Sequence, residues 1–388
     1  MVHSVNDHIE PFVLEIPDSE LDELRDRLRR SRLPERETVS PSADGTAADW
    51  SQGVPLAYLT ELARFWATEY DWRRFEAEFN AHAPHRTEIF GLGIVFLHVR
   101  SPRHDATPLL LTHGWPSSVV EPLEVADALA NPADAGAPAF HVVAPALPGF
   151  GPSGRPSTTG WTVDRTADAW AVLMERLGYE RFSAAGGDWG GRVTTALGVR
   201  HPERVEAIHT FTPYVDVPSE EGDLDERERD GLTEAREFWE RGGGYSLEQS
   251  TRPQTLAYAL SDSPVGQLAW IVEKFRDWTD CGGHPENAVS RTRLLDTVSL
   301  YWFTRSAGSS ARFYWENFPP ERSTPVHVPA AVTVFPREME RLPRSWVERR
   351  YRDLRVWSEA DRGGHFPMLE VPERYVAELV GAFAAMRS

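Results

Sequence analysis

Short apolar runs alternate with amphipathic stretches through most of the chain. The runs have the length and composition of buried strands, and the stretches between them have the pattern of helices. Strands are predicted at residues 109–112, 140–144, 181–185, 205–211, 331–335 and 354–357. Helices are predicted at residues 163–177, 192–200, 344–351 and 372–386. Because the two alternate with short connections, we expect an α/β fold with a doubly wound, largely parallel sheet.

A helical segment interrupts this alternation. From residue 219 to about residue 322 the sequence is helical and rich in aromatic residues, without a strand signal. An insertion of this kind between two halves of a sheet is expected to form a lid. We therefore predict four parts: an N-terminal domain at 1–90, the first part of the core at 91–215, a helical lid at 216–324 and the second part of the core at 325–388.

The N-terminal part is predicted to serve packing rather than chemistry. A first helix is expected to be capped by Asp18 or Ser19, and a second helix spans residues 56–69. A loose polar stretch at residues 38–49 separates them. Neither helix carries the polar cluster that an active site needs. Alternation at residues 89–100 predicts a hairpin that opens the core sheet.

The amino-acid composition limits the classes of binding partner and the cellular compartment that we expect for this protein. The chain carries 41 Lys and Arg residues against 59 Asp and Glu residues, for a formal net charge of −18. Such an acidic surface argues against nucleic acid or an anionic membrane as a partner. The single cysteine, Cys281, excludes an intramolecular disulfide and a cysteine-based metal site. The polar N-terminus and the lack of a long apolar run predict a soluble, cytoplasmic protein.

The motif around which the chain is organised lies between a predicted strand and a predicted helix. Residues 186–191 read Gly-Gly-Asp-Trp-Gly-Gly. Small residues around a nucleophile at such a turn form the nucleophile elbow of the α/β-hydrolase fold, because glycines allow the sharp turn that exposes the central side chain. That side chain is Asp188, not a serine. The predicted nucleophile is therefore a carboxylate, which suits attack on an sp³ carbon.

An acid and a base follow the nucleophile in the chain order of α/β-hydrolases. His365 lies in a glycine-rich loop after the last predicted strand, where the base of such a triad belongs. Glu338 follows the strand at 331–335 and is the predicted acid, which would hydrogen-bond His365 and set its tautomer. Asp361, nearer to His365 in sequence, is the competing candidate, and we expect it to shape the turn instead.

An oxyanion hole is predicted at His-Gly-Trp-Pro, residues 113–116, directly after a strand. The backbone N–H groups of Trp115 and Trp189 are expected to converge beside Asp188. The side chains of both tryptophans are candidates for substrate binding and, equally, for core packing. His113 is interpreted as a structural residue.

Motifs along the whole chain resemble those of the microsomal-type epoxide hydrolases. The matches lie at residues 17–24, 70–73, 113–116, 187–191, 244–245, 261–266, 312–317 and 335–338. The resemblance implies the α/β-hydrolase fold with a helical lid and an N-terminal extension typical of epoxide hydrolases. The mammalian members carry an N-terminal membrane anchor, which we expect to be absent here.

The resemblance also implies an activity. Tyr245 and Tyr314 lie in the matched lid motifs and would hydrogen-bond or protonate the epoxide oxygen. Asp188 would form a covalent alkyl ester, and water activated by His365 would hydrolyse it to a vicinal diol. This chemistry requires no metal and no organic cofactor.

Two other functions share part of this pattern. A haloalkane dehalogenase would use the same aspartate, histidine and acid, but it would not need the tyrosine pair, and the long N-terminal domain argues against it. An inactive hydrolase could serve as a binding protein. The joint presence of nucleophile, base, acid, both oxyanion loops and two tyrosines argues against that function.

The substrate is predicted only as a class. Aromatic residues of the lid indicate a bulky or aromatic epoxide; they are Phe238, Trp239, Trp270, Phe275, Trp278, Trp302 and Phe303. Lys274 is the only lysine, which indicates a GC-rich genome, and bacterial relatives in such organisms include enzymes of secondary metabolism. A homodimer is compatible with the sequence, which sets neither the oligomeric state nor the stereochemistry.

Overall fold

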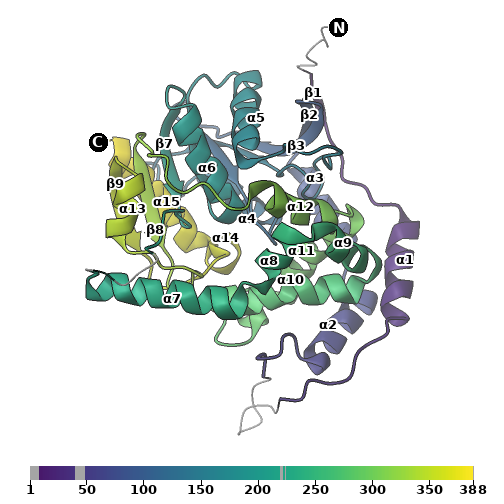
Figure 1. Cartoon of the computed structure of the whole chain (residues 1–388). Coiled ribbons are helices and arrows are strands. Elements are labelled where there is room, and N and C mark those ends of the chain that lie inside the picture. The colour runs from purple at the N-terminus through teal and green to yellow at the C-terminus, as the bar shows by residue number, and fades with distance from the viewer. Residues whose placement is uncertain (1–7, 40–48, 219–221, 223, 388) are drawn as a thin grey trace.

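The computed structural model describes residues 8–39, 49–218, 222 and 224–387 (Figure 1). The helices of the insertion and the N-terminal helices α1 and α2 lie together below the sheet in this view. Most of the loose stretch predicted at residues 38–49 falls outside the described residues, as does residue 219, the predicted start of the insertion. In the described ranges, no helix has both the length and the apolar character needed to span a bilayer.

One sheet of nine strands forms the centre of the described chain. The strands are β1 (Ile9–Pro11), β2 (His85–Ile89), β3 (Leu92–Val99), β4 (Thr107–Thr112), β5 (Phe140–Pro145), β6 (Phe182–Gly186), β7 (Val205–Thr210), β8 (Ala330–Val334) and β9 (Leu354–Glu359). Their spatial order is β1-β2-β3-β5-β4-β6-β7-β8-β9. Pairing is antiparallel from β1 to β5 and parallel from β5 to β9. This topology confirms the predicted α/β-hydrolase fold with a mostly parallel sheet.

A separate apolar core covers each face of the sheet. The core helices are α4 (Val120–Ala130), α5 (Val163–Arg176), α6 (Asp188–Arg200), α13 (Arg344–Arg350), α14 (Pro367–Glu370) and α15 (Pro372–Arg387). Successive side chains of a strand point to opposite faces, so on β4 Leu109 and Leu111 pack with α4 and α15, and Leu110 packs with α5 and α6. Burial on both faces makes these strands continuous apolar runs. The pattern does not predict α4, because that helix is buried on most sides and lacks a polar face.

The antiparallel edge of the sheet comes from the N-terminal part of the chain. The β2–β3 hairpin turns at Phe90 and Gly91, whose φ angles are 51° and 80°. Two positive φ angles are typical of the tight turns that match strand twist. The predicted hairpin at residues 89–100 therefore begins too late, since that range contains only the last residue of β2 together with the turn and β3. The predicted boundary at residue 90 lies within this hairpin, between the paired strands β2 and β3. The division of the chain into four parts stays a prediction.

In the described residues between β7 and β8, six α-helices form the helical insertion that we call the lid. They are α7 (Glu226–Gly242), α8 (Gly244–Thr251), α9 (Pro253–Asp262), α10 (Pro264–Trp278), α11 (Arg291–Phe303) and α12 (Ala307–Asn317), with a short 3₁₀ helix at Pro285–Asn287. Helix α7 extends as a long arm under the sheet (Figure 1). Helix α12 packs against α8 and α9, which brings the two matched lid motifs with tyrosines side by side.

Three helices precede the hairpin in residues 8–39 and 49–84: α1 (Asp18–Arg29), α2 (Leu56–Thr68) and α3 (Trp72–Ala81). Helix α1 begins after Pro17, and no side chain caps its N-terminus, so the predicted cap at Asp18 or Ser19 is wrong. The Asp18 carboxylate pairs instead with Arg73 at 2.5 Å. Helix α3 is capped by Asp71, whose side chain accepts a hydrogen bond from the Arg73 N–H at 3.0 Å.

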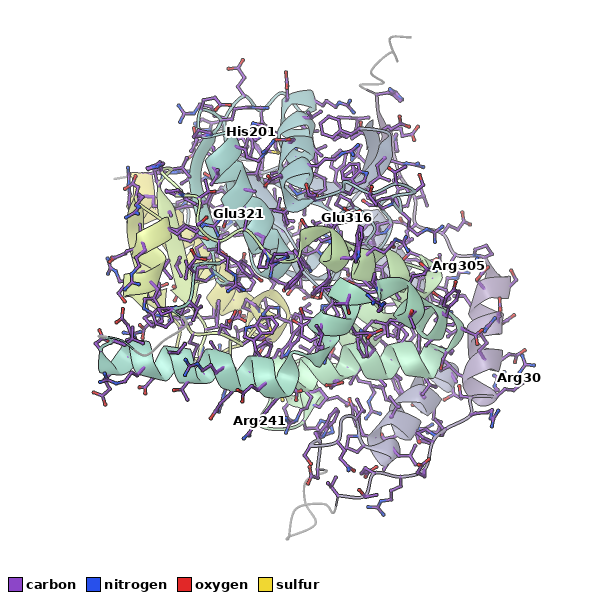
Figure 2. The ribbon with its side chains drawn as sticks, viewed as in Figure 1. Arg30, His201, Arg241, Arg305, Glu316 and Glu321 are labelled. Carbon is purple, nitrogen blue, oxygen red and sulfur yellow. The ribbon has the colours of Figure 1, made fainter. Side chains whose placement is uncertain are left out.

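The N-terminal helices pack against the lid. Helices α1 and α2 contact α10, and α3 contacts α11. The fully buried Asp296 of α11 accepts a hydrogen bond from the Tyr70 hydroxyl at 2.7 Å and pairs with Arg74. At the surface, Arg305 of the lid pairs with Glu20 of α1 at 3.2 Å; Arg305 lies at the lid edge next to α1 in Figure 2. These polar links hold the lid to the N-terminal helices.

Candidate active site

The predicted nucleophile stands at the turn between β6 and α6. Helix α6 begins at Asp188 itself, whose φ of 50° lies in the left-handed region. This conformation costs free energy for a residue with a side chain and persists only where its surroundings hold it. A Cβ atom at Gly187 would lie 2.0 Å from the Phe211 ring, and one at Gly190 would lie 1.9 Å from the Thr112 carbonyl oxygen. Glycine is therefore required on both sides of Asp188.

Two backbone N–H groups hold the Asp188 carboxylate. Trp115 donates to Oδ1 at 2.8 Å, and the N–H of Trp189 is the second donor to the carboxylate. Burial raises the pKa of Asp188, and the positive charge of His365 and both N–H groups act in the opposite direction. The N–H groups lie where the oxyanion hole is predicted, and Oδ2 faces His365.

His365 and Glu338 form a buried pair beside Asp188. His365 Nδ1 lies 2.7 Å from Glu338 Oε1, and His365 Nε2 lies 3.7 Å from Asp188 Oδ2. The backbone N–H of His365 donates to the Trp278 carbonyl oxygen at 2.7 Å, and the Thr212 hydroxyl donates to Glu338 Oε2 at 3.2 Å. These contacts orient the imidazole with Nε2 toward the carboxylate of Asp188.

The competing acid lies elsewhere. The side chain of Asp361 is 73% exposed and pairs with Arg374 at 3.4 Å. Glu338 reaches the histidine because a parallel bridge between Arg337 and Gly364 joins the loops that follow β8 and β9. The structure therefore brings Glu338, and not Asp361, to His365.

Negative charge around His365 stabilises its protonated form. Burial lowers the pKa of His365, but the Glu338 carboxylate, followed by Asp188 and, least, Glu121, raises it to about 9. Glu121 stands at the start of α4 with 3% exposure, and burial raises its own pKa to about 8. Sequence reasoning missed Glu121, whose only signal is its place shortly after the motif at residues 113–116. At neutral pH the free protein holds His365 as an imidazolium.

Replacing Glu338 by glutamine is expected to lower the pKa of His365 below about 9. Burial, which lowers this pKa, is unchanged in Glu338→Gln, whereas the carboxylate that raises it most is removed. The proton is therefore lost at a lower pH than in the wild type. NMR titration of the histidine ring nitrogens measures the shift. Asp361→Asn is the matched control, and equal shifts in the two variants would contradict the assignment of Glu338.

Two tyrosines of the lid line the same cavity as Asp188. Tyr245 on α8 and Tyr314 on α12 are both buried, with ring centroids 6.0 Å apart. Burial raises the pKa of both hydroxyls well above the ordinary value, so both keep their protons at neutral pH. The Tyr314 hydroxyl lies near Tyr245 and Trp189, yet it makes no hydrogen bond of good geometry to a described residue. Its proton is available to a molecule in the cavity.

The two tryptophans differ in their relation to this cavity. The Trp189 ring lines it and meets Tyr314 edge-on, with 4.7 Å between ring centroids. The Trp115 ring stacks on Tyr245 at 5.2 Å and is not among the described residues that line the cavity. The Trp115 ring is therefore covered by Tyr245, and its position does not support the predicted contact between the Trp115 side chain and the substrate.

His113 is placed as a structural residue. It is fully buried, and burial lowers its pKa to about 4, so the ring is neutral. Its Nδ1 lies 2.9 Å from the Gly114 carbonyl oxygen, and its Nε2 accepts a hydrogen bond from the Leu147 N–H at 3.1 Å. The ring therefore ties the oxyanion loop to the loop after β5.

The cavity walls include residues that sequence reasoning missed. Arg192, Thr212, Tyr214 and Phe318 line the cavity together with the predicted residues. Only Arg192 has a readable signal, because it follows Asp188 by one turn on the same helix.

Most of the lid aromatics lie elsewhere. Of the seven that were expected to meet a bulky substrate, Trp239 alone is among the described residues that line the cavity. Phe275 stacks on Phe366 at 4.4 Å and Phe303 packs on Trp72 at 4.9 Å. These rings fill interfaces between elements, so they do not indicate the size of the substrate.

The sequence matches families and proteins that are described as epoxide hydrolases or as having the α/β-hydrolase fold. The family described as "Epoxide hydrolase N terminus" matches residues 9–122, and the family described as "alpha/beta hydrolase fold" matches residues 107–239. The chain is 49% identical to the protein named "Putative epoxide hydrolase" of Stigmatella aurantiaca, over 98% of this chain and 86% of that protein. It is 33% identical to "Epoxide hydrolase 1" of Oryctolagus cuniculus, over 97% of this chain and 89% of that protein.

A solved structure extends the likeness to the whole fold. The structure of the Aspergillus niger epoxide hydrolase superposes with a TM-score of 0.86 at 32% identity, over 99% of this chain and 98% of that chain. The sequence matches and this superposition both span the N-terminal segment, the core and the lid. The chain therefore belongs to the microsomal-type epoxide hydrolases, a family of enzymes with the α/β-hydrolase fold.

Proposed function

We propose that the protein hydrolyses an epoxide to a vicinal diol through a covalent ester on Asp188. One observation carries the proposal: the carboxylate of Asp188 shares a cavity with the protonated phenols of Tyr245 and Tyr314 and faces the His365–Glu338 pair. Tyr245 and Tyr314 supply what an oxirane needs and a carboxylate alone does not, which is a proton donor for the departing oxygen.

Alkylation is the first step of the proposed reaction. Oδ1 of Asp188 is held by N–H groups, so Oδ2 attacks an oxirane carbon, forming an ester C–O bond as the ring C–O bond breaks. A lid phenol donates a hydrogen bond or its proton to the oxygen that is released. The alkoxide gains one proton in this step, and His365 loses the proton that it carries in the free enzyme. The product of the step is a neutral hydroxyalkyl ester.

Ester formation itself prepares His365 for the second step. The charge of Asp188 is one of the influences that raise the pKa of His365, and it disappears when the carboxylate becomes an ester. The imidazole is then neutral and takes a proton from water, which attacks the ester carbonyl carbon. Charge develops on Oδ1, where the N–H groups of Trp115 and Trp189 stabilise it. The bond between the ester carbonyl carbon and the substrate oxygen then breaks, and the departing alkoxide takes the proton of the hydroxyl that water has added. The diol leaves, Asp188 is restored as a carboxylate, and His365 keeps the other proton of the water and is again an imidazolium.

Heavy-oxygen labelling tests the covalent route. In a single turnover in labelled water, the first diol is expected to carry unlabelled oxygen, because that atom comes from Asp188. The label enters the carboxylate of Asp188 and appears in the diol only in later turnovers. Mass spectrometry of the product and of the peptide that contains Asp188 measures both. Full labelling of the first diol would contradict the ester and indicate direct attack by water.

A further inference from the structure

A second hollow adjoins the catalytic cavity. It has a cavity volume of about 440 Å³ and lies between α5 and α6 of the core and the chain that follows α12. Glu316 and Glu321, labelled in Figure 2, lie at this outer pocket where the lid meets the core. Arg192, Tyr214 and Phe318 line both hollows. These three side chains are therefore the partition between the outer pocket and the cavity that contains Asp188.

Arg192 is a cation clamped by aromatic rings. Its guanidinium carbon lies 4.2 Å from the Trp189 ring centroid, 4.1 Å from that of Tyr214 and 5.1 Å from that of Phe318. Rings against the faces of a guanidinium leave its edges for hydrogen bonds. Yet Nε and Nη1 of Arg192 are buried and have no acceptor among the described residues.

The other two arginines of the outer pocket already have carboxylate partners, and the Glu316 carboxylate accepts a hydrogen bond from the Gly160 N–H at 3.0 Å. Arg200 pairs with Asp168 at 2.6 Å, and Arg350 pairs with Glu321 at 2.5 Å. Arg192 forms no ion pair with a carboxylate of the described chain, although Asp188 and Glu340 act on it at longer range. Of those two, Asp188 is engaged by His365 and N–H groups, and Glu340 accepts a hydrogen bond from the Trp239 indole at 2.8 Å.

We propose that Arg192 binds an anionic substituent of the substrate, of the carboxylate class, and so determines specificity. The inference rests on the proposed function, since it places the oxirane at Asp188. Buried charges in proteins are normally paired, and buried N–H donors normally have acceptors. Arg192 is half-buried and has the Tyr214 hydroxyl as a neighbour, but it has no carboxylate partner and two of its buried N–H donors have no acceptor among the described residues. A cation in this state at the wall of a catalytic cavity has the properties of a ligand anchor. A carboxylate provides both the opposite charge and the acceptor oxygens.

The spacing along α6 sets the shape of this substrate. Arg192 follows Asp188 by one helical turn, which corresponds to a rise of about 6 Å. A benzene ring with the oxirane and the carboxylate in para positions spans a comparable length. Trp189, Tyr214 and Phe318 also line the catalytic cavity, and their rings favour contact with an aromatic group of the substrate. The expected substrate class is thus an aryl epoxide with a carboxylate remote from the oxirane.

Two matched epoxides test the proposal: 4-(oxiran-2-yl)benzoate and neutral styrene oxide. We expect the wild type to prefer the carboxylate in kcat/KM. Arg192→Met keeps most of the side-chain length without the charge. In this variant the preference is expected to fall on the order of 10- to 100-fold, the effect of losing a hydrogen bond to a charged group. The loss should appear mainly as a higher KM for the carboxylate substrate. Arg192→Lys restores part of the preference. Arg200→Gln is the control in the same pocket, and the preference ratio stays at the wild-type value because Arg200 is already paired.

A binding measurement separates this inference from the catalytic one. Sodium benzoate, titrated while tryptophan fluorescence is recorded, is expected to bind the wild type and to bind Arg192→Met at least tenfold more weakly, whether or not any epoxide is hydrolysed. Failure of the proposed function is a different result, namely no diol from either epoxide. Equal losses on both epoxides in Arg192→Met, no carboxylate preference in the wild type, or unchanged benzoate binding in the variant would each overturn the anion site.

Discussion

His365→Gln is expected to stall the enzyme with the alkyl ester on Asp188, with turnover reduced by about 10²- to 10⁴-fold, the contribution typical of a general base. Alkylation needs the carboxylate and the lid phenols, which the substitution leaves in place. The proton that His365 supplies in the wild type then comes from solvent through the phenols, so the ester still forms, although more slowly. Hydrolysis of the ester needs a group that accepts a proton from water, and a neutral amide does not. The ester therefore forms faster than it breaks down and accumulates. Intact-protein mass spectrometry after addition of substrate would show a mass increase equal to that of the epoxide.

Two further variants make the trapping experiment specific. His201→Gln alters a histidine that pairs with Asp168 at 2.8 Å, away from Asp188, and should neither trap an adduct nor slow turnover. Adding Asp188→Ala to His365→Gln should abolish the adduct, which assigns it to the elbow carboxylate. If His365→Gln stays unmodified with an epoxide that the wild type converts, then His365 is also needed for alkylation or is not the base.

Tyr245→Phe combined with Tyr314→Phe is expected to leave almost no epoxide turnover. Each phenol is a protonated donor in the cavity, and each replacement removes a donor with little change in volume. Loss of one donor should slow alkylation on the order of 10- to 1000-fold, by analogy with removal of an oxyanion donor. Without both, the one described phenol left in the cavity wall is Tyr214, whose ring packs against the Arg192 guanidinium. Stopped-flow measurement of ester formation in the wild type, the single variants and the double variant measures these steps.

The same variants separate epoxide hydrolysis from dehalogenation. A departing halide needs only weak N–H donors, so loss of the phenols would leave dehalogenation largely intact. Halide release from chloro- and bromoalkanes is measured in parallel, and Tyr258→Phe serves as the control because Tyr258 is 71% exposed on α9. Brisk halide release by the wild type, with epoxide turnover absent or indifferent to both tyrosines, would favour a haloalkane dehalogenase.

The fold and the place of the nucleophile were predictable because they depend on local sequence. The strand, glycine-rich turn and helix around Asp188 are contiguous, and their backbone has few alternatives once Gly187 and Gly190 must both be glycine. The buried strands β4 and β6 stand out as apolar runs because both of their faces are covered. Helix α4, buried on most sides, gave no amphipathic pattern and was missed for the same physical reason.

The choice of acid required the tertiary structure. Asp361 is closer to His365 along the chain, and nothing in the local pattern excludes it as the acid. The bridge between Arg337 and Gly364 brings the loop after β8 against the histidine and leaves Asp361 paired at the surface. Likewise, the aromatic residues of the lid look alike in sequence, and only packing separates Trp239, which lines the cavity, from Phe275, which does not.

The sequence by itself determined the family, the fold and the identity of the reactive groups, because these follow from residue types in contiguous motifs. Only the tertiary structure decided their protonation and their surroundings. The imidazolium at His365 depends on Glu338, Asp188 and Glu121, which come from three separate segments and act on one another in a buried site. The unpaired guanidinium of Arg192 depends on rings from α6, from the loop after β7 and from the end of the lid. The electrostatic interactions that set these properties depend on distances between side chains from separate segments, and those side chains come close only once the chain has folded.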